Sequence, residues 1–141
     1  MGKTQYEDYK YIMQDTSLIY IGAKYTYREL MENPEVSFKL KKVLENCIYK
    51  DRDPDMSIES DLYYMKKDSL VYKHYEQLRV KVKINIIEEK KSLFGKKKWG
   101  YKERTLKLKE FVDITLAKKK TAGIVVQEII LSKLALTSFV I

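Results

Sequence analysis

A strict alternation of apolar and polar residues runs through the middle of the chain. Every second residue from Val80 to Ile86 is apolar, and the residues between them, from Arg79 to Asn85, are basic or polar. A period of two is typical of a β-strand with one buried face and one wet face. The stretch RVKVKINI is therefore predicted to be a half-buried strand.

Strand character resumes at residues 99–111, where Leu106 and Leu108 would point inward. Trp99 and Tyr101 have the opposite parity, so a bulge or twist is expected between the two pairs. The connecting segment contains a glycine suited to a turn. The pattern predicts a long antiparallel hairpin over residues 79–109.

Helical spacing dominates the first third of the chain. Tyr6, Tyr9, Ile12 and Met13 form an apolar stripe that predicts a helix. The apolar run at 17–25, which Gly22 interrupts, fits a strand or a helix end.

Two helix starts are predicted from capping residues. Thr26 and Glu29 form a capping box that opens a short helix to about Glu32. Asn33 and Pro34 then predict a second helix that ends near Tyr49, with Leu44 on its apolar stripe.

The next two segments are less regular. Residues 50–61 are predicted to be a polar loop. Residues 62–78 are predicted to form two short elements joined at 66–69, and their Tyr and Val content favours strand whereas their apolar spacing allows helix. Whether residues 59–78 are helix or strand stays open.

The C-terminal third predicts one or two helical turns at 113–123 and a buried strand at 123–131. Residues 132–141 are expected to continue or return along the sheet as a strand, although their polar pairs recur every five residues and match no regular period. We favour an internal strand over docking on a partner. The predicted fold is a single α+β domain over residues 1–141, with N-terminal helices packed on an antiparallel sheet that contains the 79–109 hairpin and the C-terminal strands.

Composition narrows the class of protein. The chain has 141 residues, of which 45% are hydrophobic, so a globular core is expected. Cys47 is the single cysteine, which fits a reducing compartment, and no apolar run approaches the roughly 18 residues of a membrane helix. A cytoplasmic protein without membrane contact is expected. Abundant Lys, Tyr and Ile indicate an AT-rich genome, and we infer a bacterial or phage origin.

Charge is unevenly distributed along the chain. Residues 78–141 contain sixteen Lys or Arg and six Asp or Glu, a net charge of +10 in a chain whose total is +8. Such asymmetry points to a polyanionic partner. However, only four of the 28 basic residues are Arg, the residue that carries most bidentate phosphate and base recognition.

The predicted hairpin carries the candidate contact residues. Its strand lysines would share one face if the register pairs them, and its tip adds lysines beside two aromatic rings. This combination attracts phosphates and stacks on bases. The alternative, favoured because Arg is scarce, is that lysines coat a wet sheet face and protect its edges. The candidate residues for contact with a partner or with nucleic acid are Lys81, Lys83, Lys90, Lys91, Phe94, Lys96, Lys97, Lys98, Trp99, Lys107 and Lys109.

No metal, cofactor or catalytic signature is found. Asp51, Asp53 and Asp55 alternate as in a calcium loop, but Met56 and Leu62 replace the glycine and glutamate that the loop requires. We expect a solvated turn.

His74 has no nucleophile motif beside it, and Cys47 lies on a helix face expected to be buried. The GKT at residues 2–4 lacks the upstream glycine and strand of a phosphate-binding loop.

The sequence favours a non-catalytic accessory protein, without a cofactor, that acts by contact with another protein or by self-association as a homo-oligomer. The alternative is a lysine-driven, sequence-tolerant nucleic-acid-binding protein that uses the 79–109 hairpin. An enzyme or small-ligand site between helices and sheet is a third class, left open.

Overall fold

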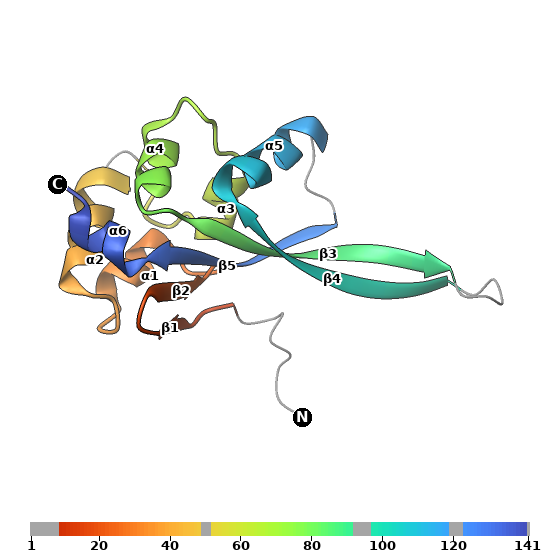
Figure 1. Ribbon diagram of the computed structural model, residues 1–141, viewed down its shortest axis with the longest axis horizontal. Coiled ribbons are helices and arrows are strands. Elements are labelled where there is room, and N and C mark those ends of the chain that lie inside the picture. Colours follow the sequence, from red (N-terminus) through yellow and green to blue (C-terminus); the bar gives the residue numbers. More distant parts are fainter. Residues whose placement is uncertain (1–8, 49–51, 92–96, 119–122, 141) are drawn as a thin grey trace.

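The computed structural model describes residues 9–48, 52–91, 97–118 and 123–140 (Figure 1). The described residues form an α+β fold with a five-stranded antiparallel sheet and six α-helices. In chain order the elements are β1 (Ile12–Gln14), β2 (Leu18–Gly22), α1 (Tyr27–Glu32), α2 (Phe38–Val43), the π-helical turn η1 (Leu44–Ile48), α3 (Ile58–Tyr63), α4 (Leu70–Gln77), β3 (Lys81–Lys91), β4 (Lys97–Lys107), α5 (Leu108–Lys118), β5 (Ile124–Ser132) and α6 (Lys133–Ser138).

The sheet has the strand order β1-β2-β5-β3-β4, and every neighbouring pair is antiparallel. β5, the strand predicted at residues 123–131, lies in the centre. The predicted hairpin is confirmed, because β3 and β4 pair in a continuous register from Lys81↔Lys107 to Lys91↔Lys97. Of the bulge or twist expected in its second strand, the bulge is absent, and Figure 1 shows the two strands twisting across each other. A register shift occurs instead between β3 and β5, where Gln127 has no β3 partner.

One face of the sheet packs against the helices. Val82 and Ile84 of β3 and Val126 of β5 are fully buried in the same apolar cluster as Phe111 of α5. We call the opposite side the outer face. One row of residues crosses all five strands on it: Met13, Tyr20, Ile130, Lys81 and Lys107.

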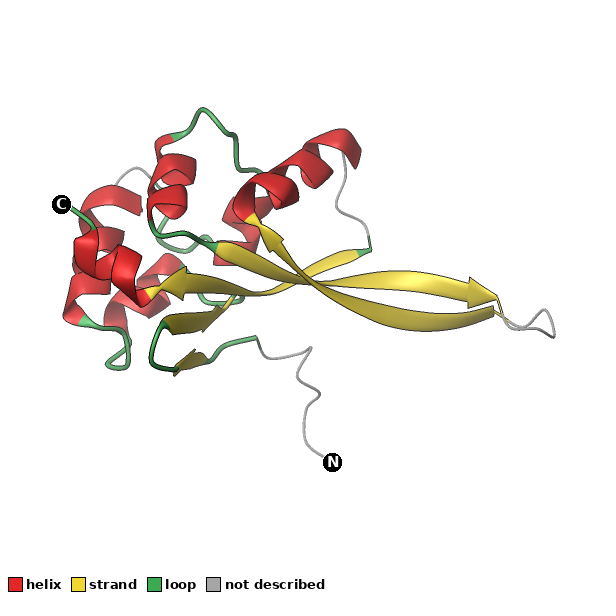
Figure 2. Ribbon diagram, in the orientation of Figure 1, coloured by secondary structure: helices red, strands yellow, loops and turns green. Residues whose placement is uncertain are grey.

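The distal half of the hairpin leaves this two-layer body. The last β3 residue paired with β5 is Ile86, opposite Ile124. Ile87 N still donates to Gly123 O at 2.8 Å. Beyond Ile87, residues 88–91 pair with 97–100 alone, and we call this two-stranded part the arm. Figures 1 and 2 show the arm projecting away from the helices.

The helix predicted over residues 6–13 is wrong for the part that the structure describes. Residues 12–14 form β1. The carbonyl oxygen of Tyr11 accepts from Gly22 N at 2.9 Å, and that of Tyr9 accepts from Lys24 N at 3.0 Å. Pairing with β2 therefore satisfies the backbone groups that a helix would have bonded internally, and it outweighs the apolar spacing.

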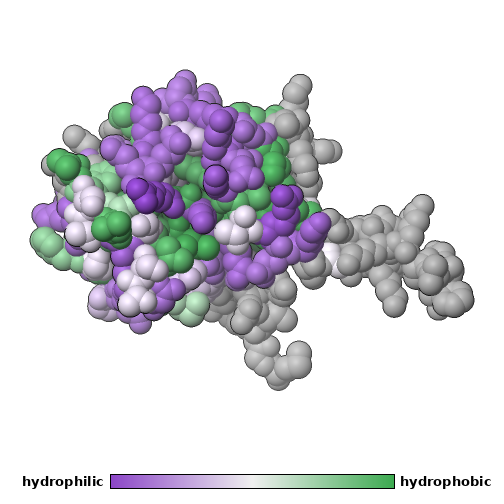
Figure 3. Space-filling view, viewed as in Figure 1, coloured by the Kyte–Doolittle hydropathy of each residue, from purple (hydrophilic) through white to green (hydrophobic). Residues whose placement is uncertain are grey.

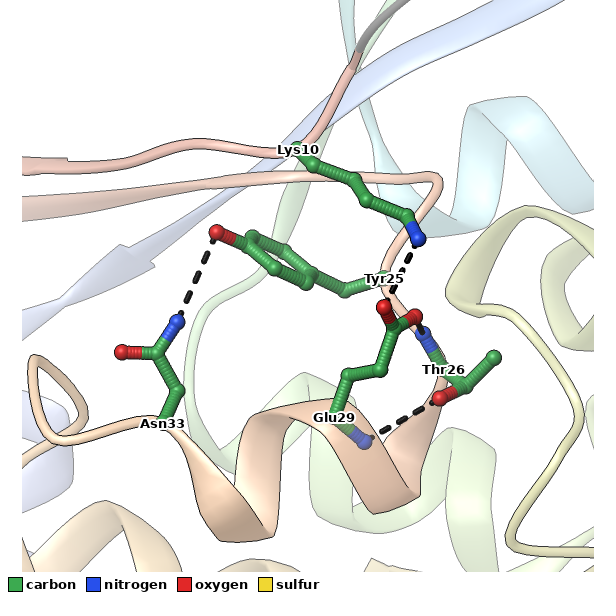
Figure 4. Close-up of polar contacts among 5 residues, drawn as sticks. All are labelled: Lys10, Tyr25, Thr26, Glu29 and Asn33. Carbon is green, nitrogen blue, oxygen red and sulfur yellow. Dashed lines mark hydrogen bonds and ion pairs between the residues drawn. The ribbon is translucent and has the colours of Figure 1, made fainter.

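The capping box is confirmed. Thr26 Oγ1 accepts from Glu29 N at 3.1 Å, and Glu29 Oε1 accepts from Thr26 N at 2.9 Å (Figure 4). The second helix, however, begins later than predicted. Asn33 closes α1, and Ser37 caps α2 by accepting from Leu40 N at 3.2 Å.

By contrast, α3 begins earlier than expected. The predicted loop at 50–61 contains the start of α3, because Ser57 accepts from Ser60 N at 3.1 Å. Both elements predicted within 62–78 are confirmed as separate elements, and both are helices. Leu62 and Val71 are buried, so the apolar spacing was the better guide there than β-propensity.

Two predictions near the C-terminus are wrong. Residues 108–111, predicted as the end of a strand, begin α5. Residues 133–138, predicted as strand, form α6 with Ser132 as N-cap. Leu136 and Phe139 are buried, whereas Val140 is exposed. The irregular polar period arises because the chain changes from strand to helix at Ser132.

Candidate functional site

The structure places the predicted contact residues in three different settings. Lys81 and Lys83 lie on β3, and Lys107 ends β4. Lys109 lies in the first turn of α5, so it does not share a strand face with the others as expected. For Lys90, Lys91, Lys97, Lys98 and Trp99 the structure describes strand positions, and Phe94 and Lys96 lie outside the described residues.

The register brings lysines together in pairs. Lys81 lies opposite Lys107, Lys90 opposite Lys98, and the next pair, 91 and 97, also consists of two lysines. Like charges directly opposite each other destabilise a sheet. The hairpin therefore concentrates positive charge at its base and at its far end, at a cost that an anionic partner would offset.

Between these two lysine-rich ends of the hairpin lies an ion pair. Lys83 Nζ lies 3.1 Å from Glu103 Oε1, so this lysine is neutralised within the protein. Lys81 and Lys107 are exposed and form no ion pair with another described side chain. Lys81 and Lys107 are thus the lysines at the base of the hairpin whose charge no described side chain neutralises.

A polar cluster lies on the outer face at the β5 register shift. Asn85 is 2% exposed and donates through Nδ2 to Tyr9 OH at 3.2 Å and to Gln127 Oε1 at 3.0 Å. Tyr11 OH donates to the buried carboxylate of Glu128. Burial and this hydrogen bond raise the pKa of the Tyr11 phenol. The cluster fixes residues 9–11 over the sheet.

A second buried network lies between the helices. Tyr27 OH donates to Asp61 Oδ2 and lies 2.7 Å from Tyr75 OH, and Arg52 Nε is 3.7 Å from Asp61 Oδ1. Burial raises the pKa of Asp61 and the pKa of both tyrosines. All three side chains are nearly inaccessible, so the network is suited to holding α1, α3 and α4 together.

The sequence did not reveal either network. Asn85 occupies a position that the alternation assigns to the wet face, and Tyr27, Asp61 and Tyr75 are far apart in the chain. Two signals were available in the sequence. Asn85 is an amide where the neighbouring polar positions of the strand are lysines, and Gln127 and Glu128 interrupt an apolar strand. Polar groups buried in a sheet need hydrogen-bond partners, so both features indicate a polar network.

Surface contacts tie the N-terminal segment to α1. Lys10 Nζ lies 2.7 Å from Glu29 Oε2, and Asn33 Nδ2 donates to Tyr25 OH at 3.5 Å (Figure 4). The hydrogen bond from Lys10 lowers the pKa of Glu29. An ion pair this exposed contributes little to stability. The contact between Lys10 and Glu29 therefore orients the N-terminal segment more than it stabilises it.

The other candidates from the sequence are dispersed. Asp51 lies outside the described residues, Asp53 accepts from Asp55 N at 2.9 Å, and Asp55 pairs with Arg28. His74 Nδ1 lies 3.1 Å from Gln77 Oε1. Among the described His, Cys, Asp and Glu residues, no group of three is placed to hold a metal ion.

A groove lined by both polar and apolar residues lies at the opposite end from the arm. Arg79, Leu134, Phe139 and Val140 are among its lining residues, and Leu134 and Val140 are 69% and 89% exposed. Figure 3 shows hydrophilic residues interspersed with the hydrophobic ones on the body, which divides the apolar surface in this view into separate patches.

In the part of the chain that the structure describes, no helix combines the length and apolarity needed to cross a bilayer. No family model matches the chain, and no curated protein is significantly similar to it.

Proposed function

We propose that the protein is a non-catalytic accessory protein that acts through the arm by binding a partner macromolecule. One observation carries this proposal: beyond Ile87, β3 pairs with β4 and with no third strand of the described chain. An isolated two-stranded hairpin is only marginally stable in water. A partner that packs along the arm would supply the missing layer.

Charge favours a nucleic acid as that partner. The arm places Lys90 opposite Lys98 and Lys91 opposite Lys97. Phosphates between these lysines would relieve their repulsion and release counterions. Because lysine acts as a point charge and reads bases poorly, binding is expected to be sequence-tolerant. Nucleic-acid binding was the alternative in the sequence analysis. We now prefer it because the strand register pairs lysines with lysines.

Contact with another protein, or with a second copy of the chain, is the second candidate. It is favoured by the groove between α4 and α6, where Leu134 and Val140 are exposed beside Arg79. Apolar side chains grouped on a surface are typical of protein interfaces. Light scattering over a range of concentrations tests self-association, and a monomer at every concentration would rule out the second copy.

The nucleic-acid proposal is tested by fluorescence anisotropy with labelled duplex and single strands at several salt concentrations. Changing both Lys90 and Lys98 to Glu should lower the slope of log affinity against log salt by about 1.4 or more, at roughly 0.7 per phosphate contact on a single strand. The matched control changes Lys66 and Lys73, which are exposed on the helical side, to Glu. Wild-type protein that binds neither probe at low salt, or equal losses in both variants, would refute the proposal.

A further inference from the structure

The outer face carries a second pair of exposed lysines, Lys81 and Lys107, which the Lys83–Glu103 ion pair and the polar cluster at Asn85 separate from the arm. We propose that Met13, Tyr20, Lys81 and Lys107 of the row on this face bind single-stranded nucleic acid, with phosphates over β3 and β4 and bases over β1 and β2. Ile130, between them in the row, is buried. The inference rests on the proposed nucleic-acid function. It adds the kind of nucleic acid and a second set of contacts on the body.

The register places these residues side by side. Met13 lies opposite Tyr20, Tyr20 opposite Ile130, Ile130 opposite Lys81, and Lys81 opposite Lys107. Neighbouring strands are about 4.8 Å apart, so the row spans roughly 19 Å. It crosses the whole sheet in the part of the hairpin where β3 is still paired with β5.

The chemistry of the row changes from one end to the other. Lys81 and Lys107 are exposed, and neither forms an ion pair with another described side chain. At the other end Met13 is 56% exposed, and Tyr20 is half-buried. A polyanion with flat apolar groups matches both ends, whereas an anionic protein surface would match only the lysines.

Asp15 sets the orientation of the ligand. Its Oδ2 accepts from Tyr20 OH at 3.1 Å, and its Oδ1 accepts from Ser17 N at 2.9 Å and Leu18 N at 2.8 Å. An aspartate is charged at neutral pH in any case, and these hydrogen bonds, with a smaller contribution from Lys133, lower its pKa further. The carboxylate disfavours phosphates directly beside β2. The phosphates are therefore directed to the lysines of β3 and β4, and the bases to the Tyr20 ring.

The presence of an aromatic ring on a sheet face selects single strands. A ring can stack only on a base whose face is free, and in a duplex both faces are already stacked on neighbouring base pairs. The lysines alone would not distinguish duplex from single strand. Preference for the single strand is thus the property that the outer face adds to the arm.

The test uses the full-length protein with a labelled oligothymidine and a duplex of the same length. Tyr20→Ala should weaken oligothymidine binding about fivefold or more and leave the salt slope unchanged, because stacking is lost and no charge changes. Tyr20→Phe should bind like the wild type. Tyr64→Ala, which removes an 82% exposed ring at the end of α3, is the matched control and should have no effect.

Full-strength binding by Tyr20→Ala, or an equal loss with Tyr64→Ala, would overturn the inference. If the Lys90 and Lys98 variant still lost binding in that case, the arm proposal would stand alone. Photo-crosslinking of the wild-type protein to an iodouracil-substituted strand tests the same contact without a mutation. A crosslink within residues 18–22 supports the inference, and crosslinks confined to the helices contradict it.

Discussion

At Gly22, a side chain as small as a methyl group would clash with the backbone of a neighbouring segment. A Cβ there would lie 2.2 Å from the carbonyl oxygen of Tyr9. Gly22→Ala must therefore push residues 9–11 off β2 or shift β2 itself. We expect the free energy of unfolding to fall by about 1–3 kcal/mol, the usual cost of overpacking. Urea denaturation measures it, and Gln14→Ala on exposed β1 is a control that should change little.

Asp61 contributes to the stability of the fold, and this contribution decreases as pH rises, the opposite of the usual behaviour of a carboxylate. Burial raises its pKa in the folded protein above the ordinary 3.8. The folded state therefore holds this proton more tightly, so stability is fully present below the unfolded pKa and is lost as pH rises through the folded pKa. Asp61→Asn keeps an acceptor for Tyr27 and removes the titration. Relative to the wild type, the variant should gain stability as pH rises.

Denaturant midpoints measured at acidic and neutral pH check this expectation. Asp15→Asn is a control of opposite sign, because the pKa of Asp15 is lowered by hydrogen bonds from Ser17 and Leu18. Its carboxylate stabilises the fold above the unfolded pKa, so this variant should lose stability relative to the wild type as pH rises. If the two variants change in the same direction, our account of Asp61 is wrong.

At the scale of elements, α6 is anchored by residues close to its end. Phe139 is 6% exposed and its carbonyl oxygen accepts from Lys39 Nζ at 2.7 Å, whereas Val140 is 89% exposed. Phe139→Ala should cost about 3–5 kcal/mol of unfolding free energy through the cavity it leaves. Val140→Ala is the neighbouring control and should be nearly silent. Equal effects in thermal or urea unfolding would show that the end of the chain packs differently.

The sequence predicted elements where local chemistry is decisive. The alternation from Val80 to Ile86 gave the strand, and Thr26 with Glu29 gave the start of α1. Sequence-based prediction failed where a contact between distant residues determines the secondary structure. β1 has its backbone groups bonded to β2, and the helix of residues 133–138 depends on a serine cap that a strand prediction overlooks. Period alone does not distinguish these cases for segments this short.

The candidate site was predicted in part for the same reason. The hairpin and its lysines were predicted from the sequence, whereas the register that places Lys81 opposite Lys107 comes from the structure. Tyr20 could not be placed beside them, because it reaches the lysines only through β5, which is distant in sequence. Lys109 was misplaced because the chain turns into α5 at Leu108.

For the whole molecule, the sheet order predicts a gradient of local stability. β5 is paired on both sides, and the arm beyond Ile87 is paired on one side of each strand. Backbone amides of residues 88–91 should exchange hydrogen faster than those of β5, because fewer contacts must break to open them. Hydrogen exchange read by mass spectrometry measures the difference. Equal protection in the unbound protein would mean that the arm needs no partner for its order.

The central place of β5 also decides when the chain can fold during synthesis. β1 with β2, and β3 with β4, are each local hairpins, but β2 and β3 touch the same strand and not each other. A ribosome adds about 5–20 residues per second, and β5 is the last strand to emerge. Pairings between such distant segments form slowly. A nascent chain halted before Ile124 thus holds two hairpins with open edges, which join into one sheet only when β5 enters between them.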